Sequence, residues 1–243
     1  MKIVGLYGNS YSDTVCYMDN YPEENKTNDM SFVESKQGGI HNVRRGLDIC
    51  SSDITVNLQP MMLSQAIIVF NKDKSTRTSL VKNLEDGEIE CNVIEANWHH
   101  ICYIDNLTKI TEQNIKDMKK TGKVSVDFCV GLSDDILPLL KNVDYVFGSK
   151  ENFTKTDTDK IIDLNPDVKI MLHDKHGTDL YGENPRYVIE YKDIVEKINP
   201  LGAGDYYASC FITQTLENKN ISDTILESHK FATTMITEEM VLV

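Results

Sequence analysis

From Trp98 onward, short apolar segments rich in β-branched and aromatic residues alternate with segments of helical spacing. The pattern predicts strands at 98–104, 124–128, 143–147 and 168–172, and helices at 111–120, 133–141, 157–164, 204–216 and 222–235. It also predicts a hairpin at 180–181 and 187–190. Strands that alternate with helices form a mostly parallel sheet with helices on both faces. We therefore predict a three-layer α/β/α fold.

The part of the chain before about residue 82 follows a different pattern. Short strands are expected at 2–6, 14–18, 32–34, 66–70 and 77–81, with a break at Gly8-Asn9-Ser10 and a hairpin turn at 71–74. Gln37-Gly38-Gly39 is expected to turn into a helix at 42–49, while 51–63 is ambiguous. Such a region can form a small sheet that stands off the main layer. We predict one domain over 1–243, with a small β lid formed mainly by about 13–38 and 66–82.

Charge narrows the classes of partner. The chain has 38 acidic and 25 basic side chains, a formal net charge of −13. Such a surface repels phosphate polyanions, so nucleic acid and anionic membranes are not expected as partners. No run of about 18 apolar residues occurs, and the apolar stretch at the N-terminus is too short for a signal peptide. We expect a cytoplasmic protein.

The cysteines and histidines do not form a metal-binding pattern. Six cysteines lie singly and none forms Cys-x-x-Cys, which is typical of reduced, buried thiols rather than of disulfides or a zinc site. His99 and His100 are adjacent in a predicted strand and so point to opposite faces. We predict no metal ion bound by the protein alone.

The sharpest local motif is Gly202-Ala203-Gly204-Asp205, directly before a long predicted helix. Small residues at a helix N-terminus let backbone N–H groups approach an anion, and the helix dipole favours negative charge there. An aspartate in the first turn is placed to accept a proton from an attacking hydroxyl. The motif by itself also fits an ordinary Gly-rich turn in which Asp205 merely interacts with the dipole.

With its context, the motif resembles the C-terminal signature Asp-Thr-x-Gly-Ala-Gly-Asp of the ribokinase-like (PfkB-type) carbohydrate kinases. Asp13 followed by Gly38-Gly39 is similar to the family's N-terminal substrate-binding region. Further segments that resemble the family are Ser75-Thr76-Arg77-Thr78 in a lid strand, Val126-Asp127 at a strand end and the stretch from Phe147 to Glu151. The resemblance covers nearly the whole chain.

The resemblance implies phosphoryl transfer from ATP, with Mg²⁺, to a hydroxyl of a small sugar or sugar-like molecule. Asp205 would be the general base, and the backbone of Gly202, Ala203 and Gly204 would form the anion hole. Substrate would contact Asp13, Gly38, Gly39, Asn42 and Arg77, and nucleotide would contact Ser149, Leu172, Asp174 and Gly177. Lids in this family often pair across a homodimer, so we expect a homodimer through the β lid.

Four departures from the family pattern keep alternatives open. Asn199-Pro200 stands where the family has Asp-Thr, and Leu172-His173-Asp174 where it has Thr-x-Gly. A Gly-Asp-Asp-x-x-Gly element that is common in the family is missing between Ile49 and Ala66. Asn42 lies one residue closer to Gly38-Gly39 than is usual in the family, so His41 could take its role. The interpretations are an active compact sugar kinase, a degenerate homologue that binds a sugar or nucleotide without turnover, and an unrelated α/β protein.

Overall fold

The computed structural model describes residues 1–71, 76–182, 187–193 and 200–241; within these ranges the side chains of 85–87 and 238–241 are excluded. The strands are β1 (Lys2–Met18), β2 (Phe32–Gly39), β3 (Ile54–Asn71), β4 (Thr76–Glu88), β5 (Trp98–Cys102), β6 (Lys123–Asp127), β7 (Tyr145–Ser149), β8 (Lys169–Asp174), β9 (Gly177–Tyr181) and β10 (Tyr187–Glu190). The helices are α1 (Ile40–Cys50), α2 (Glu112–Thr121), α3 (Lys155–Leu164), α4 (Ala203–Leu216) and α5 (Ile221–Val241), with short 3₁₀ helices η1 (Ile104–Asn106) and η2 (Leu137–Asn142).

The described strands form one sheet of ten strands, in the order β10-β9-β8-β7-β6-β5-β1-β3-β4, with β2 paired to β1. The six strands from β3 through β1, β5, β6 and β7 to β8 run parallel. Antiparallel partners flank them, β4 at one margin and β9 with β10 at the other. This is the predicted mostly parallel sheet.

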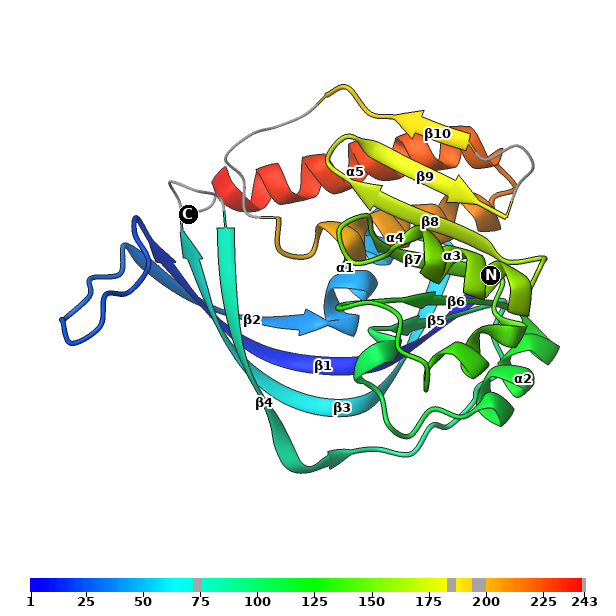
Figure 1. The fold of residues 1–243 in the computed structure, drawn as a ribbon, viewed down its shortest axis with the longest axis horizontal. Coiled ribbons are helices and arrows are strands. Elements are labelled where there is room, and N and C mark those ends of the chain that lie inside the picture. Colours follow the sequence, from blue (N-terminus) through cyan, green and yellow to red (C-terminus); the bar gives the residue numbers. More distant parts are fainter. Residues whose placement is uncertain (72–75, 183–186, 194–199, 242–243) are drawn as a thin grey trace.

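Two long strands carry the N-terminal region away from the helices (Figure 1). β3 accompanies β1 from Lys2 to Met18, while the other edge of β1 pairs with β5 up to Gly8 and with β2 from Ser10 onward. The outer parts of β1 and β3, together with β2 and β4, form an extension of the central sheet, here called the β1–β4 extension. The described parts of the segments predicted to form the lid fall on this extension.

Helices cover both faces of the central sheet (Figure 1). One buried cluster joins strand residues such as Leu6 and Phe147 to α1, α4 and α5. The other joins strand residues such as Ile101 and Val146 to α2, α3 and the two 3₁₀ helices. Alternate residues of a strand point to opposite faces, so β1, β5, β7 and β8 each contribute to both clusters. The predicted three layers are confirmed.

Several helix boundaries follow from local chemistry. α2 begins with a capping box, in which Thr111 and Asn114 satisfy each other's backbone N–H groups, and α3 repeats the arrangement with Thr154 and Asp157. The predicted end of α2 at Gly122 is also observed.

Two predictions of local structure were wrong, and the structure assigns one segment that the sequence left ambiguous. The break at Gly8-Asn9-Ser10 is a β-bulge within one strand, because Gly8 takes φ +145° and the pairing with β3 shifts there without stopping. The ambiguous segment 51–63 belongs largely to β3, which starts at Ile54. The helix predicted at 133–141 is instead a set of turns and the short η2, whose first turn contains Pro138.

Three predicted features lie partly outside the described residues. These are most of the turn at 71–74, Ser75 of the Ser75-Thr76-Arg77-Thr78 segment, and Asn199 of Asn199-Pro200. The helices that the structure does describe include none long and apolar enough to cross a membrane.

Candidate active site

A cavity of about 750 Å³ lies between the β1–β4 extension and the carboxyl ends of β5 to β8. Ligands of open α/β sheets bind at the carboxyl ends of the strands. Residues that line it include Tyr11, Asp13, Gly39, Asn42, Arg77, Ser79, Tyr103, Asp127, Cys129, Ser149, Glu151, Asn152, His173, Gly202, Gly204 and Asp205. A cavity of this size is within the range of small-molecule sites.

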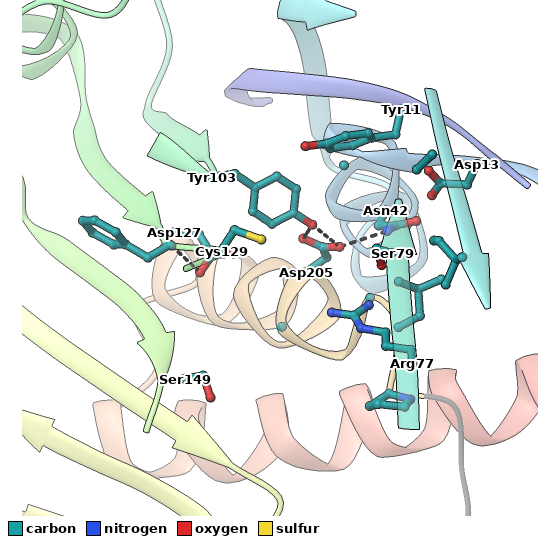
Figure 2. A pocket seen from close by; sticks show the side chains of 18 of the residues that line it. Tyr11, Asp13, Asn42, Arg77, Ser79, Tyr103, Asp127, Cys129, Ser149 and Asp205 are labelled. Atoms are coloured by element: carbon teal, nitrogen blue, oxygen red, sulfur yellow. Dashed lines mark hydrogen bonds between the residues drawn. The ribbon is translucent and has the colours of Figure 1, made fainter. Parts of the chain in front are cut away.

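Asp205 lies on this cavity in the first turn of α4, only 3% exposed. The side-chain amide of Asn42 donates to its Oδ2 over 2.9 Å. The hydroxyl of Tyr103 donates to both carboxylate oxygens, over 2.8 Å to Oδ1 and 2.9 Å to Oδ2. Figure 2 shows the two donors approaching the carboxylate from α1 and from the end of β5. The carboxylate is thereby fixed in one orientation.

Burial dominates the electrostatics of Asp205. It raises the pKa of the carboxyl from 3.8 to about 6, while the hydrogen bonds from Asn42 and Tyr103 and the charge of Arg77 act to lower it. The group is therefore ionised at neutral pH and is a stronger base than an ordinary aspartate. A general base works best when its pKa lies near the operating pH.

The N-terminus of α4 opens into the same cavity without a side-chain cap. Its N-cap, Gly202, has φ +83°, a left-handed conformation that favours glycine. The N–H of Ala203 donates to the carbonyl of Pro200 over 3.1 Å, and Ala203 is not among the lining residues. Of the three residues predicted for the anion hole, Gly202 and Gly204 thus reach the cavity.

Of the predicted substrate residues, Asp13, Gly39, Asn42 and Arg77 line the cavity, and Gly38 is not among the lining residues. Asp13 is 6% exposed and lines the wall formed by β1, with Tyr11 beside it. Gly38 lies against its carboxylate so closely that a Cβ there would stand 2.1 Å from Oδ2 of Asp13. Asn42 reaches the site, whereas His41 bonds Ser10 over 2.8 Å and is not among the lining residues.

Charge in the cavity is mainly negative. Besides Asp205, the acidic side chains of Asp13, Asp127 and Glu151 line it. Burial raises the pKa of Asp13 above its usual range, and it raises that of Asp127 much further, helped by the charge of Asp205. Arg77 extends from β4 into the cavity and is the one Lys or Arg among the described lining residues (Figure 2).

The residues predicted to contact nucleotide are dispersed. Ser149 lines the cavity at the end of β7. Leu172 is buried in the core, Asp174 pairs with Lys150 over 3.3 Å, and Gly177 begins β9; none of the three is among the lining residues. His173, between Leu172 and Asp174, does line the cavity.

Sequence reasoning missed His173, Tyr103 and Tyr11 as lining residues. His173 stacks on Tyr207 at 4.6 Å between ring centroids, and burial lowers its pKa to about 4, so it is neutral at pH 7. Its position at a strand end beside the Gly-Ala-Gly turn was the available signal, because the carboxyl ends of parallel strands share one edge. Tyr103 lacked this signal, because the strand predicted at 98–104 extended past it, whereas β5 ends at Cys102.

Comparison with solved structures shows the ribokinase-like fold. A putative ribokinase from Agrobacterium tumefaciens has a TM-score of 0.79 at 11% identity, over 97% of this chain and 91% of that one. A nucleoside kinase from Burkholderia thailandensis, solved with inosine, has 0.69 at 12%, over 96% and 90%. A ribokinase from Cryptococcus neoformans, solved with ADP, has 0.62 at 10%, over 93% and 90%.

The predicted ribokinase-like fold is thus confirmed, and the interpretation as an unrelated α/β fold was wrong. No protein-family model matches the sequence, and no curated protein matches it either. The likeness therefore lies in the fold, at sequence identities of 10–15%.

Proposed function

We propose that this protein is a kinase that transfers the γ-phosphoryl group of ATP to a hydroxyl of a small sugar or nucleoside. The observation that carries the proposal is Asp205, a buried and oriented base at an uncapped helix N-terminus that faces a cavity. The ribokinase-like fold of kinases solved with inosine and with ADP supports the two classes of ligand.

In the proposed reaction Asp205 accepts the proton of the acceptor hydroxyl as its oxygen attacks the γ-phosphorus, and ADP leaves. The N-terminus of α4 stabilises the negative charge on the transferring group through the backbone at Gly202 and Gly204. Because the phosphoryl group is anionic and the cavity is acidic, Arg77 supplies positive charge from the opposite wall.

The acceptor would lie between Asp205 and Asp13. A carboxylate accepts hydrogen bonds from two neighbouring hydroxyls at once, which suits a sugar or a ribose. Gly38 and Gly39 keep the strand end beside Asp13 free of side chains, so substrate would meet backbone there.

The nucleotide would occupy the end of the cavity lined by Ser149, His173 and Gly204. Mg²⁺ would enter with ATP and shield its phosphate charges, as it is commonly held by one or two carboxylates plus the phosphates. Asp127 and Glu151 offer oxygen ligands that fit this role. Among the described residues no group of three or more His, Cys, Asp or Glu is arranged for a metal.

The test is a screen of sugars and nucleosides with and without Mg-ATP, in which both ADP release and the melting temperature are measured. We expect at least one acceptor to give ADP release that Asp205→Asn abolishes. Asp163→Asn is the matched control, since it removes the same charge from an exposed position of α3. ADP release that survives Asp205→Asn would exclude Asp205 as the base.

The alternative is a family member that binds a sugar or nucleotide without turnover, favoured by the dispersal of Leu172, Asp174 and Gly177. It predicts thermal stabilisation by ligand without ADP release. A cytoplasmic location and assembly as a homodimer through the β1–β4 extension remain predictions.

A further inference from the structure

The hydroxyl of Tyr103 is placed on Asp205, 102 positions further along the chain. We propose that Tyr103 is a positioning residue, whose hydroxyl holds the Asp205 carboxylate in one orientation and directs the acceptor hydroxyl to Oδ1. The proposal rests on the proposed function, because it assigns a role within that reaction. It is carried by the hydrogen-bond geometry at the carboxylate and by the backbone of Tyr103.

The backbone at Tyr103 is unusual. Tyr103 follows the last residue of β5 with φ 56° and ψ 54°, the left-handed region that residues with a Cβ adopt at a cost in energy. Such conformations persist where the surroundings enforce them, and they cluster at functional sites. Here the strained residue is the one whose side chain reaches the base.

The two carboxylate oxygens are not equivalent. Oδ2 accepts from both Asn42 and Tyr103, whereas within the described part of the chain Oδ1 accepts from Tyr103 alone. A carboxylate oxygen has about two acceptor sites. Oδ1 therefore has an acceptor position left for the hydroxyl of the substrate, and in the proposed reaction Oδ1 takes its proton.

Tyr103 acts as a donor and does not exchange a proton with Asp205. Burial, reinforced by the negative charges of Asp205 and Asp127, holds the pKa of the Tyr103 phenol well above its usual range. Its hydrogen bond favours the ionised form of Asp205 and so lowers the pKa of that carboxyl.

Other groups act on Asp205 from the neighbouring elements. Arg77 of β4 lowers the pKa of the Asp205 carboxyl, and Asp13 of β1 raises it. Asp127 of β6 and Cys102 of β5 also interact with its charge. None of these groups is among the hydrogen-bond donors to the carboxylate, so the effect of the Tyr103 hydroxyl can be separated from theirs.

Tyr11 provides a matched control. Its ring packs edge-on against that of Tyr103, 6.3 Å between centroids, and both rings line the cavity. Its hydroxyl, however, accepts from Asn9 over 2.9 Å and has no contact with Asp205 among the described interactions. Removing either hydroxyl leaves the aromatic pair in place.

The experiment is a carbon-13 NMR titration of the protein labelled at its aspartate carboxyls, without ligands, with the Asp205 signal assigned by its loss in Asp205→Asn. We expect Tyr103→Phe to raise the pKa of Asp205 by about one unit, the usual effect of removing a hydrogen bond to a charged group. Tyr11→Phe should leave it unchanged. An unaltered pKa in a folded Tyr103→Phe protein would overturn the proposal.

Two further measurements cover the remaining outcomes. Trifluorotyrosine at position 103 keeps the ring and makes the phenol a stronger donor, so it should shift the pKa of Asp205 downward; no shift would overturn the proposal even if Tyr103→Phe does not fold. If turnover is found, the acid limb of the kcat profile should move upward in Tyr103→Phe, with KM for ATP unchanged. The titration needs no turnover. An inactive protein would therefore contradict the proposed kinase activity, while the pKa of Asp205 could still be measured.

Discussion

Asn42 in the first turn of α1 donates to Asp205 in the first turn of α4, across 163 positions of sequence and 2.9 Å of space. Both turns follow glycines, Gly38-Gly39 in one case and Gly202 in the other. The bond directly connects the N-termini of α1 and α4, each of which follows a glycine. The residue expected to bind substrate is therefore bound to the proposed base, and it helps to orient the Asp205 carboxylate.

Asn42→Ala should lower kcat/KM about tenfold, because a hydrogen bond to a charged group contributes about 1.5–3 kcal/mol. The loss should fall on kcat, since the bond orients the base. The control is His41→Ala, which removes the neighbouring side chain that bonds Ser10. Steady-state kinetics of both variants decide between Asn42 and His41: a larger loss in the histidine variant would assign the role to His41.

The glycines of the two turns should respond differently to alanine. At Gly204 a new Cβ would stand 3.5 Å from the nearest atom, Cε1 of His173, in ordinary contact, and alanine favours helices. At Gly39 it would stand 2.1 Å from the carbonyl oxygen of Asn9, with φ +64°. Gly204→Ala should therefore fold normally, and Gly39→Ala should be destabilised by several kcal/mol, about 3 or more.

The two variants should also be compared by their phosphoryl-transfer activity. The methyl group of Gly204→Ala would project into the space where the phosphoryl group is expected, so phosphoryl transfer should fall at least about tenfold at an unchanged melting temperature. Thermal unfolding and ADP release measured on the same preparations check this. Full activity in Gly204→Ala would argue against an anion site at the start of α4.

The layered fold and the position of Asp205 at a helix start were predictable because their signals are local. Alternation of strands and helices fixes the central layers, and Gly202-Ala203-Gly204-Asp205 marks a helix start by itself. The bulge at Gly8 was not predictable, because the same glycine either ends a strand or kinks it, and pairing along the whole of β3 decides between these outcomes. Tyr103 was missed because its role depends on a partner brought near by the fold.

The pH dependence of stability tests the burial of Asp205. Its folded pKa of about 6 lies above the value of an unfolded chain, so the stabilising contribution of its neutral form is present at low pH and is lost as pH rises through 6. Asp205→Asn has no such charge to bury. Relative to the wild type it should gain stability between about pH 4 and 7, by up to about 3 kcal/mol.

Chemical denaturation at several pH values measures this gain. It appears as a slope when the difference in free energy of unfolding between Asp205→Asn and the wild type is plotted against pH. The offset at low pH reports the change in hydrogen bonding with Asn42 and Tyr103 and does not enter the slope. Asp163→Asn, which removes a carboxylate from an exposed position of α3, is measured alongside as the matched control. A flat difference for Asp205→Asn would mean that burial does not raise the pKa of Asp205.

We predict that the outer face of the β3–β4 pair mediates a homodimer. Leu80 and Ile67 lie opposite each other in the antiparallel register and are 61% and 50% exposed, whereas the neighbouring Ala66 and Val81 line the cavity. Leu63 and Leu84 extend the exposed apolar set. An apolar face on strands at a sheet margin is usually covered by a partner.

We therefore expect sedimentation to show a dimer that Leu80→Glu converts to a monomer, because a buried carboxylate without a partner opposes association. Val188→Glu is the control, since Val188 is 60% exposed on β10 at the opposite margin of the sheet. It should leave the dimer intact. A wild-type chain that sediments as a monomer at micromolar concentration would contradict the prediction, as would a dimer that survives Leu80→Glu and dissociates in Val188→Glu.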